Sequence, residues 1–381
     1  MLPIINSYED LVEFNNNLKS DFYYNIESVS YKENTVYYTT PYTPLESVQS
    51  KDLDNFMYDY ATKNPLGVLT GKLYRLKKYD FTKLLYKMNP DEFMKQFESF
   101  VNNLLAIGET EFALWDMNIK LFGEDIILTS LINPNLKEIV IPYFITEIAD
   151  NTFLENKNLE RVIIAEGSKL TKIGTCAFKA SGLEEINLPD TLQEIGKEAF
   201  RFTHLKIVDI PSSLTMINQN TFGQCQQLET VNIKPQSSLK IIHPFAFIHT
   251  AIKNITLPES LENIGFGAFK NCTHLENIVI PDNVEEVGVA AFLSCVQLKS
   301  FTFGKKVRKI EDTVLDTCTK LKNIEIKGDI NYIGDRAFAF TAIEELVVPK
   351  SVIKDGDRAK ALSLIRKATR GCKRLDNIEF K

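Results

Sequence analysis

The stretch Leu275-Glu276-Asn277-Ile278-Val279-Ile280-Pro281 returns along the second part of the chain at a nearly fixed interval. Close copies run from Leu183 to Pro189, from Leu205 to Pro211 and from Ile343 to Pro349. A second half-motif, I-G-x-x-A-F, repeats with the same period, as in the segment from Ile264 to Phe269. Self-similarity at a period of about 20–50 residues is typical of solenoid proteins. The repeat therefore sets the fold class of this region.

The apolar residue that opens each copy forms a column of eleven members, which predicts eleven coils. They are Leu136, Leu159, Leu183, Leu205, Leu228, Ile252, Leu275, Leu298, Leu321, Ile343 and Leu375. The alternation in L-x-x-I-x-I is typical of a β-strand with one buried face. Stacking such strands at about 4.8 Å would build a parallel sheet, with the Phe of A-F in the core behind it.

In these residues the chain resembles the BspA-like, treponemal-type class of leucine-rich repeats, over residues 133–381. The resemblance implies a right-handed solenoid or arc with a parallel β-sheet, whose usual role is protein recognition. Members of this class are often surface proteins of bacteria or protists. Here the first basic residue is Lys19 and Glu9 and Asp10 come before it, unlike a secretory signal, so we expect a cytoplasmic protein.

Length and charge indicate a second, different region before the repeats. The chain has 381 residues and a net charge of −6, and residues 1–130 hold 12 Lys and Arg against 19 Asp and Glu. We predict a small α+β head domain over 1–105, a linker and N-terminal cap over 106–132 that includes Trp115, and the repeat domain over 133–381. The head is expected to form a helix over 7–18, a hairpin over 22–40 with its turn at 32–34, and helices over 53–62, 80–88 and 90–107.

Charge and hydropathy also exclude two kinds of partner. An acidic chain lacks the excess of Lys and Arg that phosphate backbones attract, so nucleic acid is not expected. No window approaches the roughly 18 apolar residues of a membrane-spanning helix, so membrane insertion is not expected.

Five of the six cysteines occupy one column of the repeat, three residues before the opening Leu. They are Cys225, Cys272, Cys295, Cys318 and Cys372, and shorter coils carry Ser181, Thr203, Thr250 or Thr341 in their place. No C-x-x-C pair is present, and the four His supply no companion set of metal ligands. We interpret the column as buried structural thiols, and we expect no metal and no cofactor.

The outward positions of the predicted strands are the candidate binding face. We select Arg161, Glu185, Ile207, Asp209, Asn232, Asn254, Asn277, Asn323, Glu325 and Glu345. The two outward columns hold no aromatic residue, and six acids against one Arg. Aromatic residues and Arg dominate binding hot spots, so this face offers few anchors. The alternative is that its polar side chains hydrogen-bond to one another along the sheet.

Near the end of the chain the repeat is interrupted by about nine extra residues between Pro349 and Leu375. Ala361, Leu362, Ile365 and Ala368 have helical spacing, which predicts an amphipathic capping helix near 357–369. It carries a candidate basic patch of Lys354, Arg358, Lys360, Arg366, Lys367, Arg370, Lys373 and Arg374. The patch is either a solvated surface or a docking site for an acidic partner, such as the acidic head of a neighbouring copy.

No motif for catalysis is found. The segment from Gly67 to Lys72 is one residue shorter than a phosphate-binding loop, and Leu73 stands where such a loop needs Ser or Thr. We therefore predict a non-enzymatic protein that recognises or scaffolds other proteins through the repeats and the head. The alternative is a structural component of a viral or phage assembly. A weaker alternative is an enzymatic head that the repeats target.

Overall fold

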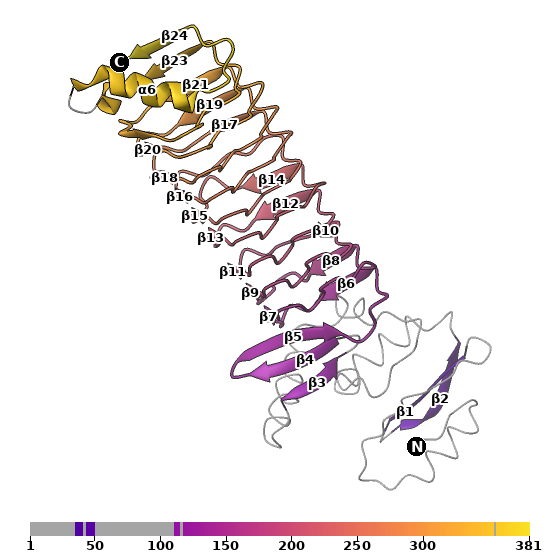
Figure 1. Cartoon of the computed structure of the whole chain (residues 1–381). Helices are drawn as coiled ribbons and strands as arrows, with labels where there is room; N and C mark the ends of the chain where they lie inside the picture. Colours follow the sequence, from indigo (N-terminus) through magenta and orange to yellow (C-terminus); the bar gives the residue numbers. More distant parts are fainter. Residues whose placement is uncertain (1–34, 41–42, 50–109, 115–116, 354–355) are drawn as a thin grey trace. The chain divides into compact units, whose positions relative to one another are not determined.

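The computed structural model describes residues 35–40, 43–49, 110–114, 117–353 and 356–381. The chain divides into two compact units, residues 1–133 and residues 134–381 (Figure 1). The helices predicted for the head, the first strand of its predicted hairpin, Trp115 and Lys354 lie outside the described residues.

The described strands of the first unit form two antiparallel groups. Strand β1 (Thr35–Thr40) pairs with β2 (Thr43–Gln49), a strand that we did not predict. Pro44 lies within β2, and proline weakens a strand pattern because it donates no hydrogen bond to a sheet. Strands β3 (Glu111–Leu114), β4 (Met117–Phe122) and β5 (Asp125–Leu131) form a meander in the segment predicted as a linker and cap. Gly123, with a φ of 62°, makes the tight turn between β4 and β5.

In the second unit the L-x-x-I-x-I segments form the strands of a parallel sheet, which we call the long-strand sheet. Its strands are β6 (Glu138–Ile141), β8 (Arg161–Ile164), β10 (Glu185–Ile186), β12 (Ile207–Ile210), β14 (Thr230–Ile233), β17 (Asn277–Val279), β19 (Ser300–Phe303), β21 (Asn323–Ile326), β23 (Glu345–Val348) and β24 (Asn377–Phe380). Asn254 bridges β14 and β17 as a single paired residue. The predicted solenoid with a parallel sheet is confirmed.

A second set of strands, two residues long, ends at the position of the Ile in the I-G half-motif, which is Val287 in one coil, and we call it the short-strand sheet. It contains β7 (Glu147–Ile148), β9 (Lys172–Ile173), β11 (Glu194–Ile195), β13 (Met216–Ile217), β15 (Ile241–Ile242), β16 (Asn263–Ile264), β18 (Glu286–Val287), β20 (Lys309–Ile310) and β22 (Tyr332–Ile333). In each strand the first residue is half-buried or exposed and the second is buried. The sequence analysis did not predict this sheet.

The two sheets define how many turns the solenoid completes. The eleven predicted strand positions are all occupied in the long-strand sheet, counting Asn254. Nine turns also carry a described short strand. The tenth instead contains the 3₁₀ helix η2 (Lys350–Val352) and the helix α6 (Arg358–Ala368), and the described chain ends after β24.

A continuous file of phenylalanine rings fills the core between the sheets. Seven buried rings stack with centroids 4.7–5.5 Å apart and planes within 13° of parallel: Phe153, Phe178, Phe200, Phe222, Phe247, Phe269 and Phe292. The opening Leu or Ile of every coil is buried except in the end members, Leu136 and Leu375. Each coil thus covers the apolar face of the next.

The turn that carries A-F has an unusual backbone that bonds each coil to the next. Seventeen non-glycine residues of the described chain have φ between 54° and 63°, and they fall at two fixed positions of the turn, such as Glu198 and Phe202. This left-handed conformation costs about 1–2 kcal/mol per residue. In return, backbone groups pair across coils, as where Phe178 N donates to Ala199 O at 2.7 Å.

The glycine of I-G lies where neighbouring coils approach most closely. A Cβ added to Gly196 would lie 2.5 Å from the backbone of Gly174, so no side chain fits there. Four coils carry Ala149, Asn218, His243 or Glu311 in place of this glycine, and the phenylalanine rings stacked by the coils of Asn218 and His243 have the widest separations, 5.4 and 5.5 Å. The glycines therefore permit the tightest stacking.

The five cysteines of the column donate hydrogen bonds to carbonyl groups inside the core. Cys225, Cys272, Cys295, Cys318 and Cys372 each donate from Sγ to the carbonyl oxygen of the core Phe one coil earlier, at 3.0–3.3 Å. All six cysteines of the sequence are described, and none forms a disulfide. Burial raises the pKa of Cys225 and Cys272 to about 11 and that of Cys318 to about 12. These three thiols therefore stay protonated donors at neutral pH.

Replacing Gly196 by Ala should destabilise the protein by about 1–3 kcal/mol, because the new methyl group must push two coils apart. The control is the reverse exchange, Ala180→Gly, at a turn residue with φ of 57°. Glycine adopts the left-handed conformation without strain, which stabilises the folded chain, but it also gives the unfolded chain more conformational freedom. Because these effects oppose each other, the free energy of unfolding should change by less than about 1 kcal/mol. Thermal unfolding measures both, and equal losses would contradict the stacking argument.

A matched pair at Cys295 tests the role of the thiol column. Cys295→Thr keeps a buried donor, which at Thr203 and Thr250 bonds to the phenylalanine carbonyl of the same coil, whereas Cys295→Val removes the donor. Valine should be less stable than threonine by about 0.5–1.5 kcal/mol, the net contribution of one hydrogen bond, because the carbonyl of Phe269 still accepts from Cys272 N. Chemical denaturation measures the difference. A valine variant as stable as the threonine variant would show that the hydrogen bond contributes nothing.

Candidate functional site

The predicted binding residues on the long-strand sheet pair largely with one another. Arg161 lies between two acids, 3.7 Å from Glu138 and 2.8 Å from Glu185. Asn232 Nδ2 donates to Asp209 at 2.7 Å. The structure therefore brings these candidates together as contacts between adjacent coils.

The same pattern continues farther along the sheet. Ser300 Oγ donates to the side chain of Asn277 at 2.8 Å, and Thr302 Oγ1 donates to Glu325 at 3.2 Å. These contacts are the hydrogen bonds along the sheet that the sequence analysis gave as the alternative to a binding role. A partner on this face would have to compete with them.

The remaining candidates of this face are spread out. Asn254, Asn323 and Glu345 are exposed, and Ile207 and Val279 are 57% and 58% exposed, but the two apolar side chains lie three coils apart. Val140 occupies one of the two outward columns of the repeat, but it is buried. The face therefore has no continuous apolar surface among its described residues.

The residue just before each long strand forms a column beside this sheet. Oppositely charged residues of that column form ion pairs between adjacent coils. Lys206 Nζ lies 2.7 Å from Glu184, Lys253 Nζ lies 2.6 Å from Glu229, and Lys299 Nζ lies 2.6 Å from Glu276. Hydrogen bonds from the lysines hold the pKa values of the three glutamates below their usual range. Each of these lysines thus forms an ion pair with the glutamate at the same position of the coil before it.

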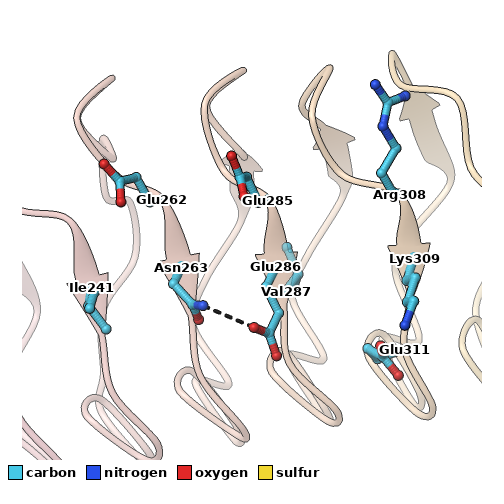
Figure 2. Close-up of a pocket in the computed structure, with 9 residues that line it drawn as sticks. All are labelled: Ile241, Glu262, Asn263, Glu285, Glu286, Val287, Arg308, Lys309 and Glu311. Carbon is cyan, nitrogen blue, oxygen red and sulfur yellow. Dashed lines mark hydrogen bonds between the residues drawn. The ribbon is translucent and has the colours of Figure 1, made fainter.

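The short-strand sheet carries a hollow that the sequence analysis missed. We call it the acidic hollow; it has a volume of about 520 Å³ and spans β15 to β20 (Figure 2). Its lining consists of Ile241, Glu262, Asn263, Glu285, Glu286, Val287, Arg308, Lys309 and Glu311. The signal in the sequence is the column just before the Ile of I-G, whose residues point outward from the short strands.

Side-chain size explains the position of the hollow. Gly265 and Gly288 follow β16 and β18, so no side chain projects from the sheet at these points. In the next coil Glu311 occupies the glycine position, and its carboxylate lies at the edge of the hollow (Figure 2). Two consecutive glycine coils bounded by a glutamate coil therefore form the depression.

Charges in the acidic hollow are less completely paired than those of the column just before the long strands. Asn263 Nδ2 donates to Glu286 at 3.0 Å, and Lys240 lies 3.1 Å from Glu262. Within the described residues, the side chains of Glu285, Glu311 and Lys309 make no ion pair within 4.0 Å and no hydrogen bond. The hollow thus offers two carboxylates and an ammonium group to a partner.

An exposed aromatic patch lies in the turns that follow the short strands of the hollow. Phe266 is 43% exposed and contacts Phe245 edge to face, with ring centroids 5.0 Å apart. Pro244 and Val289, in the same column of the adjacent coils, are half-buried. We call these four residues the Phe266 patch. Most other coils carry Asp, Thr, Lys or Gln in the column of Phe266, so the aromatic side chain is local to this region.

Helix α6 presents the predicted basic patch at the other end of the short-strand sheet. Asp357 caps the helix by accepting from Lys360 N at 2.8 Å, and Ala361, Ile365 and Ala368 are buried. All described members of the patch are exposed: Arg358, Lys360, Arg366, Lys367, Arg370, Lys373 and Arg374. Residues 350–381 contain ten Lys and Arg against four Asp and Glu. This end of the solenoid is therefore strongly basic.

Two kinds of site are not found in the part of the chain that the structure describes. No three His, Cys, Asp or Glu residues there are placed to hold a metal ion together. None of the helices in the same residues has both the length and the apolar composition required to cross a membrane.

Comparison with solved structures finds proteins of similar fold, two of which are described as leucine rich. A leucine rich cell surface protein from Faecalibacterium prausnitzii is 22% identical, with 71% of this chain and 94% of that chain covered and a TM-score of 0.37. The leucine rich repeat protein of T. pallidum is 19% identical, with 68% and 100% covered and a TM-score of 0.38. The pneumococcal vaccine antigen PcpA is 16% identical, with 64% and 82% covered and a TM-score of 0.39. No curated protein matches the chain.

The family comparison addresses the repeats directly. Residues 128–243 and 240–359 match the model of the BspA type leucine rich repeat region, in six copies, which confirms the resemblance seen in the sequence. The match covers more than half of the chain, so the chain belongs to the BspA type leucine rich repeat family.

Proposed function

We propose that the protein is a non-enzymatic recognition and scaffolding protein that binds another protein through its solenoid, with the first unit as a second module. The observation that carries this proposal is the acidic hollow beside the Phe266 patch. Aromatic side chains are enriched in protein interfaces, and charged side chains that have no partner in the chain supply complementary contacts at the rim of such an interface.

Rigidity of the solenoid supports this role. The short strands under the hollow pair in register, Ile241 with Asn263 and Asn263 with Glu286, so the spacing between their side chains is fixed by the backbone. A surface that is ordered before binding loses little conformational entropy when a partner docks. The repeats therefore suit a scaffold.

The hollow suits a partner better than the long-strand sheet. On that sheet, binding would have to replace contacts such as those between Arg161 and Glu185 or between Asn232 and Asp209. Glu285, Glu311 and Lys309 have no such contacts to lose among the described residues. Binding at these three side chains therefore gains charge interactions without breaking existing ones.

Capture by the tagged full chain from extracts of cells that carry it should test this function. The bound protein should fall about tenfold with Glu285→Gln combined with Lys309→Gln, because both charged contacts are removed. The control is Glu325→Gln combined with Glu345→Gln on the long-strand sheet, which should leave capture unchanged. Loss with the control pair alone would move the binding site to that sheet, and no specific capture by the wild-type chain would refute recognition.

A further inference from the structure

The basic helix of the chain is complementary to the acidic hollow. We propose that the acidic hollow binds helix α6 of a second copy of this chain. This inference rests on the proposed function, because it names a partner for the same surface. It follows from three matches between the two surfaces, in charge, in apolar contact and in position on the solenoid.

The first match is the sign of the charges. The hollow is lined by four glutamates, Glu262, Glu285, Glu286 and Glu311, against Arg308 and Lys309 (Figure 2). From Arg358 to Arg370, the helix and the turn after it carry five basic residues and no acid. The two surfaces are therefore opposite in net charge.

The second match is apolar. Leu364 of α6 is 36% exposed, between Lys360 one turn before it and Lys367 one turn after it. A helix face with a central leucine flanked by lysines thus faces solvent. The Phe266 patch beside the acidic carboxylates is its counterpart. Leu364 would lie against Phe266 while the two lysines reach Glu285 and Glu286.

The third match is position. Helix α6 contacts β22 and lies on the same side of the solenoid as the short strands (Figure 1). Hollow and helix are about three coils apart on one face, at about 4.8 Å per coil. A two-fold axis that lies in the plane of that face, across the solenoid and midway between the two sites, turns the two faces toward each other and places each copy's α6 over the other copy's hollow. Both contacts form at once, and the assembly closes as a dimer, the commonest symmetric oligomer.

Charge reversal in the full chain tests the proposal by sedimentation velocity at low and high salt. The wild type should be a dimer at low salt that weakens at high salt, because exposed charges are screened. Glu285→Lys with Glu286→Lys should raise the dimer dissociation constant at least about tenfold. Lys360→Glu with Lys367→Glu should have the same effect, and all four changes in one chain should restore the dimer because the charges are again opposite.

The restored dimer separates a lost interface from a misfolded chain, since unfolding cannot be rescued by two more substitutions. A control that changes net charge equally, Glu325→Lys with Glu345→Lys on the long-strand sheet, should leave the dissociation constant unchanged. Leu364→Ser should weaken the dimer without changing charge. Thermal unfolding of each variant confirms that the fold is retained.

Several outcomes would overturn the proposal. These are a wild type that is monomeric at low salt, a four-fold variant that stays monomeric, or open chains longer than dimers. If the lysine substitutions in α6 abolish the dimer but the glutamate substitutions in the hollow do not, α6 binds another acidic region, such as the first unit. If the wild type is monomeric while hollow variants still lose a captured foreign protein, recognition stands and only this partner is wrong. If hollow variants change neither measurement, both proposals fall.

Discussion

The stacking of one coil on the next is the constraint on which the rest of the solenoid depends. A single coil has too few residues to enclose its own apolar side chains, so its phenylalanine ring and opening leucine are buried only by the neighbouring coils. The backbone accepts a strained left-handed conformation twice per turn to bring hydrogen-bonding groups into line with the next coil. Buried thiols and hydroxyls then satisfy the carbonyl groups that the stacked turn leaves inside.

This stacking converts sequence columns into surface columns. A residue type repeated at the period of the chain becomes a row of neighbours at coil spacing, and opposite charges in such a row pair across coils, as Lys253 and Glu229 do. The same rule makes exceptions visible. Where two glycine coils meet a glutamate coil, the short-strand sheet is hollowed and its charges are incompletely paired. The departure from the repeat, rather than the repeat itself, marks the surface to which we assign partner binding.

The candidate site changed between sequence and structure for a related reason. From the sequence, the long strands were the obvious outward face, and their polar residues were chosen as binding candidates. Those residues are indeed neighbours, but they mostly contact one another, as Asn232 and Asp209 do. The short strands were missed because a two-residue strand has no alternation to detect, and its single outward residue stands beside an Ile that belongs to the core motif.

The sequence by itself determined the family, the solenoid fold, the parallel long-strand sheet and the place of the cysteines three residues before each opening leucine. These features depend on residue types that recur at a fixed spacing and that only stacked coils can bury. That spacing can be read directly along the sequence. The tertiary structure alone decided which exposed side chains pair and which are left for a partner. Glu286 and Lys309 are 23 residues apart in sequence, yet they line one hollow because their coils are adjacent. Pairing depends on distances between coils and on side-chain direction, and no column of the sequence records either.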